Sequence, residues 1–274
     1  HAGIIEPGHF RFNVAGERII TLEGKLFFTH KGVEKLLEGK TPEQALPFVE
    51  RLSGDMAASN ALAFCQAAEA IAGCRVPDRA TAIRSVLCEL ERMTMHVHDL
   101  ANIAGNGTGY TVMAAHGFRI KERLVRLSTE LLGNRFWRGA IVPGGIVADL
   151  SAEKLQRIAS IVKEAHDEMA ALLKMCLSAD AERERLETTG VLTKETAIAL
   201  GALGIAARAS GIDRDVRLTH PYASYGNHRP TLVTEQTGDV YARFMVRARE
   251  LEDSQRLIAE LITKVAAGSV RTAC

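Results

Sequence analysis

The stretch "DRATAIRSVLCELERMTMHVHDLANIA", residues 78–104, predicts a long helix and, with it, the fold of the chain. Its apolar residues recur at intervals of three and four positions, which places them along one side of an α-helix. Three further segments have the same character, at about residues 56–72, 110–132 and 151–176. Because short links join most of these segments, the pattern predicts an antiparallel helical bundle.

Strand-like alternation occurs only near the start of the sequence. Residues 9–28, "HFRFNVAGERIITLEGKLFF", alternate through Phe10 and Val14, turn near Gly16 and resume at Ile19. This alternation predicts one hairpin or a small meander.

Shorter helices are expected at both ends of the bundle. In "TPEQALPFVERL", residues 41–52, Thr, Pro and Gln form a capping box, and Pro47 should kink the helix or shift its start. A short helix follows Thr193, and a last long one spans about residues 238–267. We therefore expect a mainly α protein that forms one structural unit. Its small β region covers residues 1–30 and its helical bundle residues 31–274.

Composition sets broad limits on function. Of 274 residues, 47% are hydrophobic and 24% charged, which is ordinary for a globular chain. The net charge of +1 gives no sign of a nucleic-acid partner. We see no apolar run that could span a bilayer and no secretory leader. The chain starts at His1 and stops at Cys274, so we treat it as a piece of a longer polypeptide.

The cysteines predict free thiols. None belongs to a CxxC motif, and three lie in helical apolar patterns, which favours buried thiols in a reducing compartment over disulfides. The five are Cys65, Cys74, Cys88, Cys176 and Cys274.

His96 and Asp99 lie three positions apart on the helix at residues 78–104, so their side chains can meet and could pass a proton. A satisfied polar pair without catalytic work is the alternative, and the pattern alone favours it. His98 faces another side of the helix, so the two histidines cannot share a metal as an i, i+4 pair would.

Two polar stretches have structural interpretations. "GNGTGY", residues 105–110, lacks the Lys-Ser/Thr of a P-loop and a preceding strand, so it is expected to break a helix. In "RASGIDRDVR", residues 208–217, arginines alternate with aspartates, which favours an internal salt-bridge network over an anion site.

Glu6 stands among apolar residues in "IIEPGHFRF" and is fixed by Pro7. Burying this carboxylate is expensive unless it has a partner or a task. The residues themselves leave a functional and a structural role open.

Six stretches covering nearly the whole chain resemble the large subunit of membrane-bound group 4 nickel-iron hydrogenases, of the formate hydrogenlyase and hydrogenase-4 type. They are also similar to the homologous 49 kDa (D) subunit of respiratory NADH-quinone oxidoreductase. One block alone would carry little weight, whereas six in order identify the family. In chain order they are "HAGIIEPGHFRF" (1–12), "THKGVEKLLEGKTPEQALPFVERL" (29–52), "CELERMTMHVHDL" (88–100), "NRFWRGAIVPGG" (134–145), "RASGIDRDVRLTHPY" (208–222) and "GDVYARFMVRARELEDSQRLI" (238–258).

The resemblance implies a helical bundle with a small β part, as the pattern does. It also implies partners: an iron-sulfur small subunit, a 30 kDa-like subunit or domain, and membrane arm subunits. A peripheral position on the cytoplasmic face of the inner membrane follows. Any iron-sulfur cluster or nicotinamide site of the family would belong to partner subunits, so this chain is expected to bind no cofactor in isolation.

The stretch "RLSGDMAASN" stands where the hydrogenases have Arg-x-Cys-Gly-x-Cys-x-x-x-His. Arg51 and Gly54 remain, but Ser53 and Met56 replace both cysteines and Asn60 replaces the histidine. A hydroxyl and a thioether cannot replace bridging thiolates on nickel and iron, so no metal is expected. The tyrosine that binds the quinone headgroup in the quinone enzymes is also missing. Arg51, Ser53, Gly54 and Met56 are predicted to line a vestigial site, in a tight turn facing a cavity.

The stretch around Glu6 has the hydrogenase form, in which the glutamate carries protons to the metal site. The resemblance therefore makes Glu6 the proton-transfer group, with His96 and Asp99 as a relay behind it. Bare apolar surface is expected around residues 135–145 and 208–225, where partner subunits would bind.

Two functions from different classes follow. The first is a subunit of a membrane-associated, complex I-like oxidoreductase that couples electron transfer to proton handling and is inactive as an isolated fragment. The second is a non-catalytic scaffold that holds the iron-sulfur partner against the membrane arm. Within the first class, a quinone-reducing subunit with a non-standard headgroup site stays open.

Overall fold

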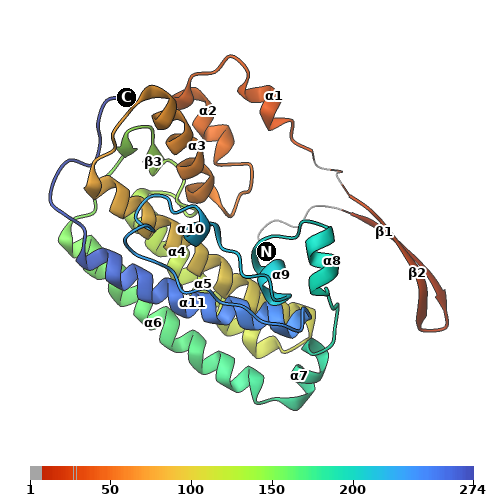
Figure 1. The fold of residues 1–274 in the computed structure, drawn as a ribbon. Coiled ribbons are helices and arrows are strands. Elements are labelled where there is room, and N and C mark those ends of the chain that lie inside the picture. Colours follow the sequence, from red (N-terminus) through yellow and green to blue (C-terminus); the bar gives the residue numbers. More distant parts are fainter. Residues whose placement is uncertain (1–7, 27, 29) are drawn as a thin grey trace.

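A computed structural model describes residues 8–26, 28 and 30–274 (Figure 1). Glu6 lies outside the described residues. The element order confirms a mainly helical chain preceded by a small β-hairpin. Among the described residues, none of the helices combines the length and apolar character needed to cross a membrane.

The hairpin consists of β1 (His9–Ala15) and β2 (Arg18–Lys25), which pair antiparallel with a register shift after Asn13. Gly16 has φ +63°, a conformation that glycine adopts without steric conflict, and it forms the turn. Every residue of both strands is exposed, and the ribbon projects away from the helices (Figure 1).

Four long helices make the body of the molecule: α4 (Asp78–Asn102), α5 (Thr111–Leu132), α6 (Ala152–Leu177) and α11 (Val240–Thr263). Helix α4 packs on α5, α5 on α6, α6 on α11, and α11 on α4, which closes a four-helix bundle.

Cross-helix contacts set the helix directions. In three of the four neighbouring pairs, residue numbers rise along one helix while those of their partners fall along the other, so these helices are antiparallel, as predicted. The directions of these three pairs make α6 and α11 antiparallel as well. The contacts are Glu89–Ser254 and Asp99–Arg247 between α4 and α11, His98–Lys121 and Ala101–Gly117 between α4 and α5, and Arg119–Glu168 and Glu130–Arg157 between α5 and α6.

Small residues let α4 approach α5 closely. A Cβ atom added to Gly117 would stand 2.5 Å from the Cβ of Ala101, closer than carbon atoms pack. Helix α4 then passes into one π-helical turn, η1 (Ile103–Gly107), where Thr108 N donates to Ile103 O at 3.1 Å. The predicted helix break at residues 105–110 is confirmed, and it takes this π-helical form.

Among the described residues, three helices precede the bundle: α1 (Val33–Leu37), α2 (Pro42–Val49) and α3 (Ala57–Ala72). The predicted capping box of α2 is confirmed, because Gln44 N donates to Thr41 Oγ1 and Thr41 N donates to Gln44 Oε1. Helix α2 begins at Pro42 with Pro47 inside it, so Pro47 does not shift its start.

Four short helices lie between α6 and α11. They are α7 (Asp180–Leu186), α8 (Lys194–Ala199), α9 (Gly204–Ala209) and α10 (Val216–Thr219). The side chain of Thr193 caps α8 by accepting from Thr196 N at 3.2 Å, which is the start that the sequence predicts.

A second, minute β ladder lies outside the region where we expected strands. It pairs β3 (Ile141–Val142) with β4 (Gly145–Ile146), and Gly145 also bridges to Arg271. Arg84 of α4 donates to Gly145 O at 3.0 Å and forms a buried ion pair with Glu69 of α3. This ladder therefore joins the C-terminal segment to α3 and α4.

The prediction of free cysteines is wrong for two of the five. Cys74, after α3, and Cys274 form a disulfide with a Cα–Cα distance of 5.3 Å across a sequence separation of 200. Tertiary structure brings these distant residues together, and residue spacing contains no sign of that. The prediction holds for Cys65, Cys88 and Cys176, which are buried and free.

Exposed apolar surface is present, but most of it lies outside the two regions where we predicted it. Trp137 and Tyr225 are buried within the two expected loops, although Val216 is exposed. The exposed apolar side chains gather instead on two other parts of the chain. These are the hairpin, with Phe10, Phe12, Val14, Ile19, Ile20 and Leu22, and the surroundings of α8, with Val191, Ile198, Leu200 and Leu203.

Candidate functional site

The turn between α2 and α3 is tight and partly enclosed. Met56 N donates to Ser53 O at 3.1 Å, and the hydroxyl of Ser53 donates to the carboxylate of Asp55. Gly54 and Asp55 are buried, while Ser53 and Met56 are half-buried. The predicted turn is confirmed, and neither Ser53 nor Met56 extends fully into solvent. The predicted position of Glu6 near this turn falls outside the described residues.

The backbone of the turn is held from two sides. Arg138 Nη2 donates to Gly54 O at 3.4 Å, which links the turn to the loop that carries β3 and β4. Lys31 Nζ donates to the carbonyl oxygens of Arg51 at 3.2 Å and Leu52 at 3.1 Å. The side chain of Arg51 is exposed, and its Nη1 donates to Pro47 O, near the end of the preceding helix α2, at 2.5 Å.

Two buried carboxylates flank the turn, and neither was among the predicted site residues. Before the turn, Glu50 accepts a hydrogen bond from Gly139 N at 2.6 Å. Burial raises the pKa of Glu50, against the lowering effect of that hydrogen bond. On the other side of the turn, Glu91 of α4 accepts hydrogen bonds from the first residues of α3, from Ala58 N at 2.8 Å and from Ser59 N at 2.9 Å.

Glu91 is the more strongly perturbed of the two. Only 1% of its surface is exposed, and burial raises its pKa to about 7, against the hydrogen bonds from Ser59 and Ala58. The charge of Asp55 adds to the increase. A carboxyl group that titrates near neutral pH can take up or release a proton under physiological conditions.

Asn60, at the position of the hydrogenase histidine, has its amide nitrogen Nδ2 buried without a hydrogen-bond partner in the part of the chain that the structure describes. The same holds for Nε of Arg138. Polar atoms in this condition are uncommon in folded proteins, and two of them near one turn are consistent with space for water or a ligand.

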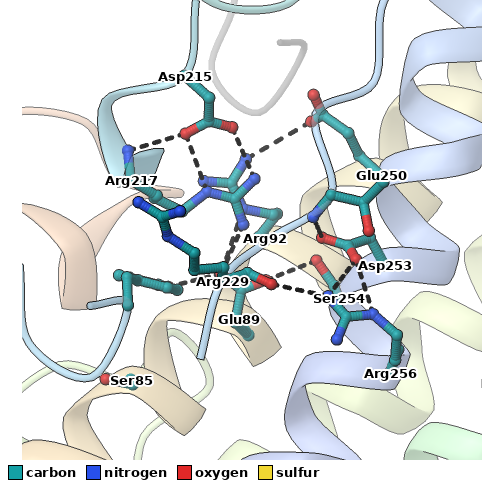
Figure 2. A network of polar contacts seen from close by, with 12 residues as sticks. Ser85, Glu89, Arg92, Asp215, Arg217, Arg229, Glu250, Asp253, Ser254 and Arg256 are labelled. Atoms are coloured by element: carbon teal, nitrogen blue, oxygen red, sulfur yellow. Dashed lines mark hydrogen bonds and ion pairs between the residues drawn. The ribbon is translucent and has the colours of Figure 1, made fainter. Parts of the chain in front are cut away.

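A separate network of buried charges holds the loop at residues 208–225 onto α4 and α11 (Figure 2). Arg217 pairs with Glu89 at 2.9 Å and with Asp215 at 2.8 Å. Burial would raise the pKa of Glu89, but Arg92 and Arg217 keep it below its ordinary value. Glu89 also accepts hydrogen bonds from Tyr225 at 2.5 Å and Ser254 at 2.7 Å.

Ion pairs in this part of the fold join four arginines and four carboxylates. The cations are Arg92, Arg208, Arg217 and Arg247, and the anions are Glu89, Asp99, Asp215 and Glu250. Arg208, Asp215 and Arg217 of the arginine-aspartate stretch join this network, as the sequence predicts, although Asp213 and Arg214 are exposed. Their partners Glu89 and Glu250 come from helices. Mutual pairing of buried charges of this kind indicates a structural role.

The structure places both predicted relay residues in this network. His96 Nε2 lies 3.0 Å from Glu250 Oε2, and Asp99 pairs with Arg247 at 2.9 Å. Burial lowers the pKa of His96, against the opposing effect of the hydrogen bond to Glu250. The partners described for both residues thus come from α11. The proposed relay role of His96 and Asp99 stays a prediction.

Sequence reasoning missed the buried glutamates of α4 and α11. A signal was present, because Glu91 follows Leu87 by four positions and so shares its buried side of the helix. A carboxylate at a core-facing position requires a partner, and that rule was applied to Glu6 alone. In the described ranges, 8–26, 28 and 30–274, no group of three or more His, Cys, Asp and Glu side chains could hold a metal ion.

Together, the fold and the site define a mainly helical protein with buried acidic groups around one tight turn. The family model for "Respiratory-chain NADH dehydrogenase, 49 Kd subunit" matches residues 107–273. The chain therefore belongs to the family of the respiratory-chain NADH dehydrogenase 49 kDa subunit.

Individual relatives agree with that family. The chain is 34% identical over 256 residues to the NADH-quinone oxidoreductase D 1 subunit of Chloroherpeton thalassium, covering 93% of this chain and 58% of the relative. It is 32% identical over 257 residues to hydrogenase-4 component G of Escherichia coli, covering 92% and 43%. It is 31% identical over 260 residues to the NADH-quinone oxidoreductase C/D subunit of Phocaeicola vulgatus, covering 95% and 50%. The chain thus spans about half the length of these relatives.

Proposed function

We propose that this chain is the large subunit of a membrane-associated, complex I-like oxidoreductase of the hydrogenase-4 and formate hydrogenlyase type. Electron transfer in that complex is coupled to proton handling. The names of the relatives support this proposal, because they belong to NADH-quinone oxidoreductase and to hydrogenase-4. The hydrogenase-like form of the stretch around Glu6 favours the hydrogenase side of the family.

The observation that carries the proposal is the acidic surrounding of the Ser53–Met56 turn. Proton-coupled chemistry needs groups that change protonation near the operating pH. Burial, against the hydrogen bonds from Ser59 and Ala58, raises the pKa of Glu91 to about 7 beside this turn. Glu6 is the proposed proton-transfer group, and His96 and Asp99 are proposed to relay protons behind it.

The residues of the turn do not fit a nickel-iron centre. That centre needs anionic sulfur ligands, whereas Ser53 has a hydroxyl and Met56 a neutral thioether. We therefore assign no step of the reaction to such a centre in this chain. Arg51, Ser53, Gly54 and Met56 are proposed as the lining of a remodelled site.

The proposed partners are an iron-sulfur small subunit, a 30 kDa-like subunit or domain, and membrane arm subunits. The double letter C/D in the name of the Phocaeicola vulgatus relative supports the second of these. The exposed apolar side chains of the hairpin and of the α8 region suit contacts with other subunits. The proposed location is the cytoplasmic face of the inner membrane.

Two alternative functions follow because the turn lacks the cysteine ligands of the hydrogenases. A scaffold protein would keep the fold and hold its partners together, and the network of buried charges supports this role. A quinone-reducing subunit would bind the headgroup at a non-standard site, because the turn lacks the tyrosine of the quinone enzymes. Unpartnered Asn60 Nδ2 next to the turn, within the described part of the chain, favours a retained ligand site over a scaffold.

The experiment that separates these functions uses the native complex containing the full-length chain. Metal content, hydrogen evolution and quinone reduction are measured on the parent and on Glu6→Gln. We expect Glu6→Gln to abolish proton-coupled activity without unfolding the protein, because the amide cannot carry a proton. Parent-like activity of this variant would remove Glu6 from the mechanism. A purified complex with neither activity would favour the scaffold.

A further inference from the structure

Helix α3 is capped by a residue of another helix. Its own N-cap residue, Met56, makes no side-chain capping hydrogen bond. Glu91 of α4 takes that place, accepting from Ala58 N at 2.8 Å, from Ser59 N at 2.9 Å and from Ser59 Oγ at 2.6 Å. Three donors therefore converge on one buried carboxylate, immediately after the Ser53–Met56 turn.

The three hydrogen bonds favour the charged form of Glu91. Oε1 accepts one hydrogen bond and Oε2 accepts two, all from groups that donate. A proton on either oxygen turns an acceptor into a donor. Because the site is buried, a donor that loses its partner finds no water to replace it. A proton on Oε2 reverses the bond with Ser59 Oγ, whose hydroxyl can also accept, and it weakens the bond from Ser59 N, because an acid hydroxyl is a poorer acceptor than a carboxylate oxygen.

The neighbouring groups oppose the charge that the bonds favour. Burial is the largest influence and Asp55, from the turn, adds its own charge; together they raise the pKa of Glu91 to about 7. Cys88, on the same helix, is also in electrostatic contact with Glu91. Lys121 of α5 is in electrostatic contact with Asp55. The charged and neutral forms are thus closely balanced.

We propose that Glu91 is a positioning residue that couples proton uptake to the conformation of the Ser53–Met56 turn. Charged Glu91 fastens the start of α3 to α4, and protonated Glu91 releases it. Glu50 holds the other side of the turn through Gly139 N at 2.6 Å. The proton-dependent movement is therefore on the α3 side of the turn, where Glu91 binds. The inference rests on the proposed function, since it assigns a proton-dependent movement to the proposed site.

Hydrogen exchange across the turn tests the coupling without any need for turnover. Exchange of the backbone amides of Ala58 and Ser59 is followed in the full-length protein from about pH 5.5 to 8.5 and corrected for intrinsic rates. We expect their protection to fall on the order of tenfold as the pH decreases through the transition of Glu91. In Glu91→Gln, the protection should be low and independent of pH.

Ser59→Ala provides a second test, which stays valid even if Glu91→Gln does not fold. It removes one donor to the carboxylate, so the charged form is less stabilised and the transition should move to higher pH. Glu43→Gln, on the exposed surface of α2, is the matched control and should behave like the parent.

Two results would overturn the proposal. One is the same pH dependence in the parent and in Glu91→Gln, and the other is an unchanged transition in Ser59→Ala. The exchange transition can be present in the parent while the pH profile of turnover is the same in the parent and in Glu91→Gln. In that case the coupling at Glu91 stands and the proposed proton-handling function fails. The two ideas are thereby tested separately.

Discussion

Arg217 has 1% of its surface exposed and two buried carboxylate partners, Glu89 and Asp215. Arg217→Met keeps an unbranched side chain of related size but leaves both carboxylates without their closest cation. Breaking a buried pair by removing one partner commonly costs about 3–5 kcal/mol. We expect a loss of that order in the free energy of unfolding, measured by urea denaturation.

Arg126→Met provides the comparison for that measurement. Arg126 is exposed and pairs with Glu122 one helical turn away. Surface pairs of this kind contribute about 0.2–1 kcal/mol, so this variant should stay close to the parent. Equal losses in the two variants would contradict the structural role that we assign to the buried network.

Glu91 should also give the stability of the protein a pH dependence of known sign. Its native pKa is raised from 4.5 to about 7, mainly by burial, so the folded state binds the proton more tightly than the unfolded state. Protonated Glu91 therefore adds to the free energy of unfolding. This stabilisation is fully present below pH 4.5 and is lost as the pH rises through about 7.

The comparison with Glu91→Gln isolates this contribution. Relative to the parent, the variant should gain stability as the pH rises from 4.5 to about 7, by at most about 1.4 kcal/mol per pH unit. Urea denaturation at several pH values measures it. A stability difference that stays constant over this range would show that Glu91 is charged throughout.

At the scale of elements, the contact of α4 with α5 depends on a glycine. Gly117→Ala places a methyl group 2.5 Å from the Cβ of Ala101, so the helices must move apart. Overpacking of this kind costs about 1–3 kcal/mol, which should exceed the gain in helix propensity. The measurement is the midpoint of thermal unfolding.

A compensating change distinguishes this crowding from a general effect of alanine. In the double variant Ala101→Gly with Gly117→Ala, the methyl group moves to the opposite helix and the close approach is restored. We expect the double variant to recover part of the lost stability, as a double-mutant cycle would register. Additive losses would mean that the two positions do not touch.

At the scale of the whole molecule, the Cys74–Cys274 disulfide closes a loop across 200 residues. A bond that closes so long a loop restricts the unfolded chain, and such bonds commonly stabilise by about 2–4 kcal/mol. Cys274→Ser should remove that contribution, and its urea midpoint should no longer respond to a thiol reductant. A parent midpoint that is insensitive to reductant would argue against the bond.

Predictions from the sequence succeeded where neighbouring residues decide the outcome. The hairpin turn at Gly16, the capping box at Thr41, the start of α8 at Thr193 and the periodic long helices all depend on residues within a few positions. The turn at Ser53–Met56 belongs to the same class, because a short polar stretch with glycine separates two apolar periodic segments.

Only tertiary structure decided which distant groups meet. Glu91 caps α3, His96 lies against Glu250, and Cys74 reaches Cys274, each across at least 32 positions of the sequence. Periodicity gives the side of a helix that is buried, but not the residue that lies opposite. The protonation state of a buried group depends on the residue that lies opposite and on the loss of water around the group. The tertiary structure therefore decides the chemistry of the site.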